Sequence, residues 1–455
     1  MTSFRIDKPA SRTARARARF RWLQVGFFPL AVLAFCAVGV RHFNTLFTTT
    51  SRWIFLALLI ASLVPKGRIL QTFKYGFSLP LVIYLMWCLS TTVWSEVPDL
   101  SLLKAAALAL SSMALVAGGS YWSSRYATTE TLHFLLPVVL LALAAGIGGV
   151  AEPQDVRDVN EFVYGGLAGN PNFLGTLLAI SLPFAIYFAY RAFYRGGSGA
   201  MRFLSLVLGA ALCLMLMRSG SRASMLCAAV TVFSALMALT ANKKIAIITT
   251  GVFGILAVIL VVPQVQQHLY EHYVLKGSTE KEGVFFSRYQ PWEESYRAAL
   301  QGGYVGVGYG VTAGQLNFDV GLTAQTYGRE KGNAQLAVWE ETGLVGLALY
   351  AILLVAIFRR FFRAFGHAKG ELKILIAIVG GVAMGLTVQS VFEAWWTAPG
   401  SIQSAAFWAF VGVGAGLVKQ IEASRREARA RVASARRAQL AMPPGAPGWR
   451  GSAAS

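Results

Sequence analysis

Apolar segments that could cross a lipid bilayer recur along almost the whole chain, and they constrain its fold more than any other feature. The hydrocarbon core of a bilayer accommodates about 17 to 20 apolar residues of helix. The composition agrees, since 55% of the residues are hydrophobic and only 14% are charged. We therefore predict an all-α polytopic membrane protein with about twelve transmembrane helices. The candidate spans are 24–41, 53–64, 76–94, 102–120, 131–150, 173–190, 203–217, 223–240, 245–262, 335–358, 374–392 and 401–418.

The distribution of charge predicts how these spans are oriented. The net charge is +20, which in a soluble protein would suggest nucleic acid, but no nucleic-acid-binding motif accompanies it. With a cytoplasmic N-terminus, the cytoplasmic pieces carry +24 and the rest of the chain carries −4. This asymmetry follows the positive-inside rule and predicts that both termini are cytoplasmic. The pieces are 1–23, 65–75, 121–130, 191–202, 241–244, 359–373 and 419–455.

Four polar segments fall on the opposite face in this topology. They are 94–101, 152–172, 218–222 and the long segment 263–333. The last is rich in charges, aromatics and glycine, which is typical of chemistry at a membrane surface, and we expect it to contain short helices. The predicted organisation is a basic cytoplasmic N-terminus (1–23), helices 1–9 (24–262), a large loop on the opposite face (263–333), helices 10–12 (334–418) and a basic cytoplasmic tail with a disordered end (419–455).

Three arginines on this face could bind an anion. Arg218 and Arg222 flank Ser219-Gly220-Ser221 in a tight connection between two spans. Their guanidinium groups and the loop N–H groups suit a phosphate or diphosphate, although arginines at this depth can also snorkel to lipid headgroups. Arg288, in the large loop, could bind the same anion or pair with nearby acidic residues.

Other polar residues lie where segments enter the membrane. Lys331, Asn333 and Glu341 precede or open the tenth span, where a carboxylate is costly and therefore a functional candidate. The alternative for Glu341 is structural pairing with a nearby arginine. Asn170 and Asn172 begin the sixth span, where either side chain could cap a helix. The glycine run 302–310 lacks the lysine of a nucleotide-binding loop and indicates close turns near a substrate or a helix.

A metal site is the competing reading for one segment of the large loop. His268-Leu269-Tyr270-Glu271-His272 matches the H-x-x-E-H pattern of some metalloproteases, with both histidines on one helical face. No third ligand is identifiable from the sequence. The four cysteines lie in apolar runs without metal-binding spacing, so we expect packing residues.

The polar pieces of this face, taken in order, resemble the O-antigen ligase and polymerase superfamily of bacterial cell envelopes. The resemblance extends from about residue 85 to 350. It rests on Trp94-Ser95-Glu96-Val97-Pro98, Asn170-Pro171-Asn172, Ser219-Gly220-Ser221-Arg222, Arg288 with Trp292, Gly306-Val307-Gly308-Tyr309-Gly310, and Asn333 with Leu336, Glu341, Gly343 and Gly346.

The resemblance implies a glycosyltransferase of the bacterial inner membrane that uses no metal and no cofactor. It implies periplasmic-face transfer of a glycan from undecaprenyl diphosphate to an acceptor hydroxyl, on lipid A–core for a ligase or on another repeat unit for a polymerase. In this reading Arg218, Arg222 and Arg288 bind the donor diphosphate. Arg288, Glu341, Lys331 and Asn333 are the expected catalytic residues, and Asn170, Asn172 and Trp292 are expected to position substrate.

One departure separates this chain from the ligases of that family. They usually have His-Asn at the start of the last motif, whereas Gly332 precedes Asn333 here. A proposed acid/base or acceptor-orienting group is therefore missing, which favours a polymerase or ligation to another acceptor. Another class remains open, a flippase or transporter of lipid-linked sugars, which would place charged or broken helices near the bilayer midplane, often in repeated halves.

Overall fold

The computed structural model describes residues 27–72, 74–126, 128–152, 158–160, 163–239, 286–313 and 331–441. Its α-helices are α2 (Phe27–Ala37), α3 (Ser51–Leu63), α4 (Arg68–Thr72), α5 (Ser78–Ser90), α6 (Pro98–Arg125), α7 (Leu136–Gly148), α9 (Pro171–Tyr194), α10 (Gly199–Ser219), α11 (Arg222–Leu239), α14 (Phe286–Gly302), α15 (Ala334–His367), α16 (Gly370–Gln389) and α17 (Ile402–Ala441). Short 3₁₀ turns are η1 (Val64–Lys66), η2 (Thr91–Val93), η3 (Thr128–Glu130), η4 (His133–Leu135), η5 (Gly149–Ala151), η6 (Gly166–Ala168) and η9 (Trp395–Thr397). Two short strands, β1 (Asp158–Asn160) and β2 (Val163–Tyr164), pair antiparallel.

The architecture is a helical membrane bundle, as the apolar segments predicted. Within the described residues, eight helical segments are long and apolar enough to cross a membrane, and three shorter apolar helices accompany them. Eleven of the twelve predicted spans overlap these helices, while the span predicted at 245–262 lies outside the described residues. The β1–β2 pair was not predicted, because two strands of two or three residues leave no periodic pattern in a sequence.

α17 forms the centre of the bundle. Its membrane-spanning part is almost completely buried and packs most extensively against α6 and α16. Gly119 of α6 and Gly412 of α17 bring two backbones together, because a Cβ added at Gly119 would lie 2.7 Å from the carbonyl oxygen of Ala409. By contrast α10 is mostly exposed and presents apolar side chains such as Phe203 and Leu214 outward. A mostly apolar exposed helix requires lipid around it, so the chain is a multi-pass membrane protein.

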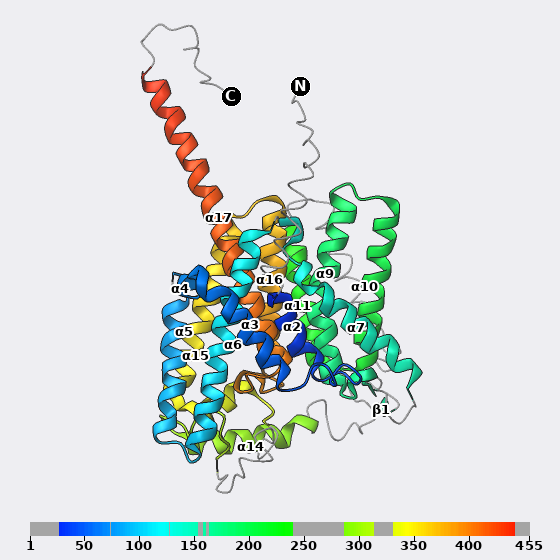
Figure 1. Ribbon diagram of the computed structural model, residues 1–455, viewed down its shortest axis with the longest axis vertical. Coiled ribbons are helices and arrows are strands. Elements are labelled where there is room, and N and C mark those ends of the chain that lie inside the picture. The colour runs from blue at the N-terminus through cyan, green and yellow to red at the C-terminus, as the bar shows by residue number, and fades with distance from the viewer. Residues whose placement is uncertain are drawn as a thin grey trace.

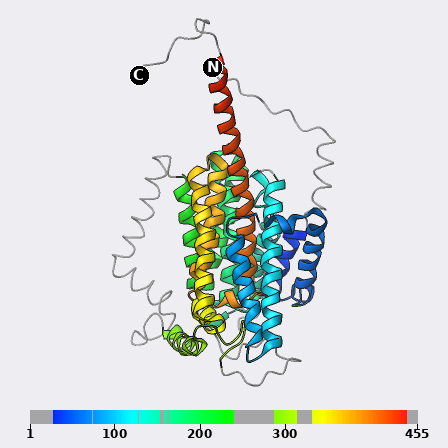
Figure 2. The same cartoon turned by 90° about the vertical axis from the view of Figure 1, so that its left-hand side faces the viewer.

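The bundle has two distinct ends. α14 lies across one end, and the C-terminal part of α17 projects beyond the other (Figures 1 and 2). Hydrogen bonds join the connections at the α14 end, including Trp94 Nε1 to the Gly306 carbonyl (3.1 Å) and Asn333 Nδ2 to the Val391 carbonyl (3.0 Å). The described parts of all four predicted polar segments lie at this end, which we call the α14 end. The tail predicted from 419 continues α17 as a helix to Ala441, and residues 442–455 lie outside the described part.

α15 is broken near the α14 end by Gly343. This residue has φ 70° and ψ −177°, a backbone conformation that is essentially restricted to glycine. The break opens the helix to the turn after α14, since the N–H groups of Leu344 and Val345 donate to the carbonyls of Gly303 and Tyr304 (3.1 and 3.2 Å). The loop is thereby joined to the membrane helix through backbone hydrogen bonds.

Replacement of Gly343 by alanine is expected to destabilise the protein. The strained backbone alone costs about 1–3 kcal/mol for a residue with a Cβ, and that Cβ would also collide with the backbone of Tyr304. A lowered midpoint of thermal unfolding in detergent checks this. The matched control is Gly366→Ala in the same helix, where a Cβ meets nothing within 4 Å and stability should rise by about 0.5–1 kcal/mol. Equal midpoints of thermal unfolding for Gly343→Ala and Gly366→Ala would contradict a strained backbone at Gly343.

Candidate functional site

A buried lysine lies at the centre of the α14 end. The Nζ of Lys331 is 2.6 Å from Oε1 of Glu341 and 3.4 Å from Oε2 of Glu340, and it donates to the Val311 carbonyl at 2.9 Å. The lysine side chain is 2% exposed and both carboxylates are fully buried. Glu341 therefore pairs with a lysine, and within the described part of the chain no arginine forms the pair considered from the sequence. Such a buried cluster is stable only if its members satisfy one another.

The glycine run after α14 wraps around this cluster. The N–H groups of Val307 and Gly308 donate to the carbonyls of Glu340 and Glu341 (3.0 and 3.1 Å), and the N–H of Gly310 donates to Oε2 of Glu341 (2.6 Å). Four of its glycines, at 303, 306, 308 and 310, have positive φ, so side chains there would strain the turn. The run forms close turns against a helix, as predicted.

A second group of polar residues surrounds the start of α9. Oδ1 of Asn170 accepts hydrogen bonds from the N–H groups of Asn172 and Phe173 (2.9 and 3.1 Å), so Asn170 is the helix cap that the sequence suggested. One turn later Gly175 packs against the connection between α10 and α11, where a Cβ would lie 2.6 Å from the Ser221 Cβ. Two motifs about 50 residues apart in the sequence are thereby in direct contact.

Arg218 and Arg222 lie at the two ends of that connection. Arg218 is in the last turn of α10, and its guanidinium carbon is 5.5 Å from the centre of the Tyr164 ring, a cation–π contact. Arg222 is the first residue of α11 and is half-buried. Arg218 is exposed, and Gly220 (φ 61°) ends α10 between the two arginines.

A cavity of about 250 Å³ lies between the two groups. Three residues predicted from distant segments reach it: Asn170, Asn172 and Lys331. Its other lining residues are Phe173, Glu393, Ala394 and Gln403. The cavity is large enough for part of a sugar–phosphate headgroup and has both positive and negative charge in its wall, so it is the candidate binding site at this end.

Glu393 and Gln403 are site residues that the sequence analysis missed. Glu393 belongs to the connection between α16 and α17, which is short and was not counted among the polar segments, and Gln403 lies in the first turn of α17. Nε2 of Gln403 donates to Oε2 of Glu393 at 2.8 Å. A carboxylate between two predicted spans was the available signal, because such groups are costly at a membrane and are usually functional.

A polar path links the cavity to the Ser219–Ser221 turn. Nε2 of Gln389 donates to Oγ1 of Thr176 (2.8 Å) and to Oγ of Ser224 (3.2 Å), and Ser221 donates to Ser224 (2.9 Å). Gln403 reaches the same Thr176 hydroxyl at 3.4 Å. These buried bonds cross-connect α9, α11, α16 and α17, so the walls of the cavity are held in one arrangement.

Two further predicted residues, Asn333 and Trp292, make contacts that hold the chain in place. Asn333 caps α15, since its Oδ1 accepts from the Leu336 N–H at 2.9 Å. Nε1 of Trp292 donates to the Gly332 carbonyl at 3.0 Å. A Cβ added at Gly332 would lie 3.0 Å from Cδ1 of this indole, so Trp292 covers the position where the ligases of the resembled family have histidine. Arg288 belongs to α14, but its side chain, like His268 and His272, lies outside what the structure describes.

The edge of the α14 end carries one exposed charge cluster. Glu152 accepts from His42 Nε2 (2.9 Å) and pairs with Arg41 Nη1 (3.2 Å). The hydrogen bond from His42, and then the charge of Arg41, lower the pKa of Glu152. These contacts tie the segment before β1 to the end of α2. Among the described residues, no group of three or more His, Cys, Asp or Glu side chains is arranged to hold a metal ion.

The fold and the site together define a class: a multi-pass, all-α membrane protein with a polar cavity at one end of the bundle. No protein-family model matches the chain, and no curated protein matches it. The resemblance to the O-antigen ligase and polymerase superfamily therefore rests on the residues that carry it, and what it implies is taken up as a proposal.

Substituting the two asparagines of the cavity separates a structural role from a functional one. We expect Asn170→Ala to lower the free energy of unfolding by about 1 kcal/mol, because two N–H groups of α9 lose their cap. Asn172→Ala should leave stability within about 0.5 kcal/mol, because its side chain makes no capping bond to α9. Denaturant unfolding in micelles measures both. A larger loss of stability for Asn172→Ala would contradict the assignment of the cap to Asn170.

Proposed function

We propose that this protein transfers a glycan from undecaprenyl diphosphate to an acceptor hydroxyl in the manner of an O-antigen ligase. The observation that carries the proposal is the shared cavity, which Asn170, Asn172 and Lys331 all line. Asn170 and Asn172 belong to one of the matched motifs, and Lys331 lies in the segment leading into another. An enzyme requires a binding site that gathers residues from distant motifs. Motifs that served only the fold would not need to share a cavity.

The reaction needs stabilisation of a leaving diphosphate. An acceptor oxygen attacks the anomeric carbon, the bond from that carbon to the phosphate oxygen breaks, and negative charge grows on the departing undecaprenyl diphosphate. In the proposal Arg218, Arg222 and Arg288 bind this diphosphate, since fixed cations aimed at developing charge lower the barrier.

The proton of the acceptor hydroxyl needs a base. Glu341 remains the base predicted from the sequence, and its bonds to Lys331 and Gly310 give it a second role in orienting the lysine. Glu393 lines the cavity itself, so we add it as a second candidate base. Lys331 lines the cavity while Glu340 and Glu341 hold its side chain, and Trp292 and Asn333 fix the segment that carries it.

The proposal places the α14 end in the periplasm and both termini in the cytoplasm of a bacterium, with the chain in the inner membrane. The charge asymmetry supports this orientation, because the positive connections fall at the opposite end. The donor lipid then enters from the outer leaflet, and the acceptor approaches from the periplasm.

A repeat-unit polymerase of the same superfamily is the second candidate. The observation that favours it is the packing at Gly332, where Trp292 covers the place of the ligase histidine. The acceptor would then be another lipid-linked repeat unit, and lipid A–core would not be needed.

Purified protein in nanodiscs, given a synthetic undecaprenyl-diphosphate glycan without added metal, tests both candidates. Mass spectrometry would follow release of undecaprenyl diphosphate. Release with lengthened glycan identifies a polymerase, and release only with a separate acceptor identifies a ligase. Intact donor that crosses the bilayer of vesicles without any release would refute the enzyme and establish a flippase.

A further inference from the structure

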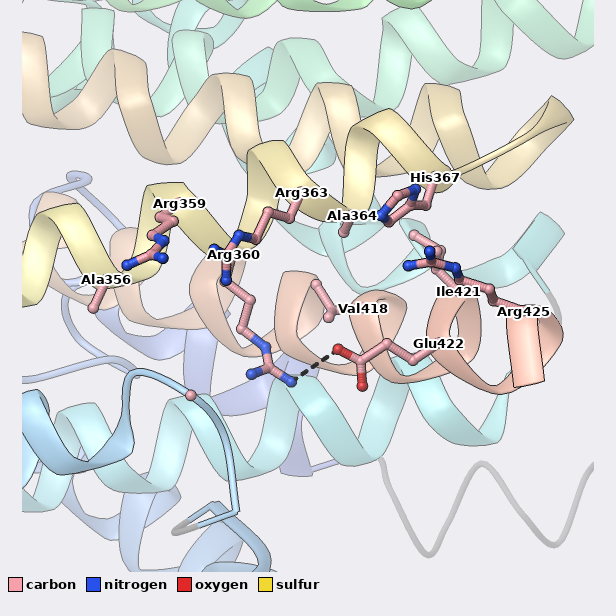
Figure 3. A pocket seen from close by; sticks show the side chains of 11 residues that line it. Ala356, Arg359, Arg360, Arg363, Ala364, His367, Val418, Ile421, Glu422 and Arg425 are labelled. Atoms are coloured by element: carbon pink, nitrogen blue, oxygen red, sulfur yellow. Dashed lines mark hydrogen bonds and ion pairs between the residues drawn. The ribbon is translucent and has the colours of Figure 1, made fainter. Parts of the chain in front are cut away.

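A second cavity lies at the opposite end of the bundle, between α15 and α17. Its volume is about 360 Å³. Its polar lining is overwhelmingly basic (Figure 3) and comprises Arg359, Arg360, Arg363, His367 and Arg425, with Glu422 as the one carboxylate. Nothing in the proposed transfer reaction uses this cavity, which we call the basic cleft.

One arginine of the basic cleft is part of the fold. Nη2 of Arg360 lies 3.2 Å from Oε1 of Glu422 and joins α15 to α17, as Figure 3 shows. The same guanidinium packs against the backbone at Gly76. Because Arg360 neutralises the single carboxylate, the other cations of the basic cleft are left with a surplus of positive charge.

That surplus lies on Arg359, Arg363 and Arg425. Among the residues that the structure describes, no ion pair joins any of the three to a carboxylate. The three are exposed at their helix surfaces while their side chains border one cavity. Guanidinium groups that line one cavity suit a phosphate group, because each can donate two parallel hydrogen bonds to its oxygens.

The surroundings of the basic cleft are apolar and face lipid. Ala356, Val418 and Ile421 line its inner part. On the outer face of α15, Val355 and Phe362 are 64% and 59% exposed. They lie four residues before and three residues after Arg359, so the three share one helical face. An apolar track thus leads along the helix to the arginines, at the level where the apolar parts of both spans end.

We propose that the basic cleft binds the headgroup of an anionic phospholipid. The phosphate lies among Arg359, Arg363 and Arg425, and the acyl chains lie along the exposed apolar face of α15. A free phosphate would use the same arginines, but it would leave the apolar track without a role. Cationic pockets between membrane helices, at the level of the headgroups, are suited to such lipids.

Native mass spectrometry of the whole protein, released from micelles containing phosphatidylglycerol or phosphatidylcholine, tests the proposal. We expect retained phosphatidylglycerol and little phosphatidylcholine. Arg359→Gln with Arg363→Gln should weaken phosphatidylglycerol binding on the order of 20-fold, since each cation near an anionic lipid surface contributes substantially. The matched control, Arg426→Gln with Arg429→Gln, removes two charges from the exposed projecting part of α17 and should retain the lipid.

Three results would overturn the proposal. Equal loss of lipid in both double variants would show attraction by net charge alone, and equal retention of both lipids would show binding without charge. Stabilisation by inorganic phosphate against thermal unfolding, with no retained phospholipid, would assign the basic cleft to free phosphate. An unchanged unfolding midpoint for Arg359→Gln with Arg363→Gln in lipid-free micelles confirms that any loss of lipid does not come from misfolding.

Discussion

Arg222→Ala is expected to lower the rate of glycan transfer by about 10²–10³-fold while the protein stays folded. Arg222 begins α11 beside the Ser219–Ser221 turn, whose hydrogen bonds lead to the wall of the cavity. In the proposed reaction this cation stabilises negative charge that develops in the transition state, as the diphosphate departs. The loss should therefore fall mainly on kcat and less on KM. Steady-state kinetics with the synthetic lipid-linked glycan measure kcat and KM separately.

Arg288→Ala should have an effect of the same size, and a second arginine of the same helix provides the control. Arg297 of α14 is 74% exposed and forms an i,i+4 pair with Glu293, so Arg297→Ala should change the rate less than about twofold. If Arg222→Ala and Arg288→Ala both kept full activity, the diphosphate assignment would be wrong. The alternative of arginines that snorkel to lipid headgroups would then stand.

Much of the helical bundle can be predicted from the sequence, because the formation of each membrane helix depends on the residues within it. A run such as 173–190 has to form a helix in lipid, and the structure places α9 at Pro171–Tyr194. The start of α15 was predicted within one residue, because Asn333 ends the polar segment and caps the helix. The two-ended arrangement of polar connections is equally predictable, because each span reverses the direction of the chain.

The composition of the site could be predicted only in part. The side chain of Lys331 looks solvated in a polar loop, and only the fold shows that Val311 and Glu341 enclose it. Glu393 was missed since nothing near it in the sequence indicates that α9 supplies the opposite wall of its cavity. The cavity brings Glu393 together with Asn170, more than 200 residues earlier in the chain, and no local pattern determines that arrangement.

Lys331→Met is expected to destabilise the protein by about 3–5 kcal/mol, the usual cost of removing one partner from a buried ion pair. Methionine fills the volume of the lysine, but Glu341 keeps its charge and loses the cation 2.6 Å away. Glu340 loses its partner at 3.4 Å as well. Unfolding of the purified variant by sodium dodecyl sulfate in mixed micelles measures the change in free energy.

The double variant Lys331→Met with Glu341→Gln tests whether this buried pair contributes only to stability. Glutamine still accepts the hydrogen bond from the Gly310 N–H and removes the unpaired charge, so most of the lost stability should return. Glu340 keeps one bond from the Ala313 N–H (2.9 Å) and limits the recovery. If Lys331→Met alone were as stable as the wild type, the ion pair between Lys331 and Glu341 would not form. Recovered stability with lost transfer would place Lys331 or its partner Glu341, the proposed base, in the chemistry, whereas recovery of both would make the pair structural alone.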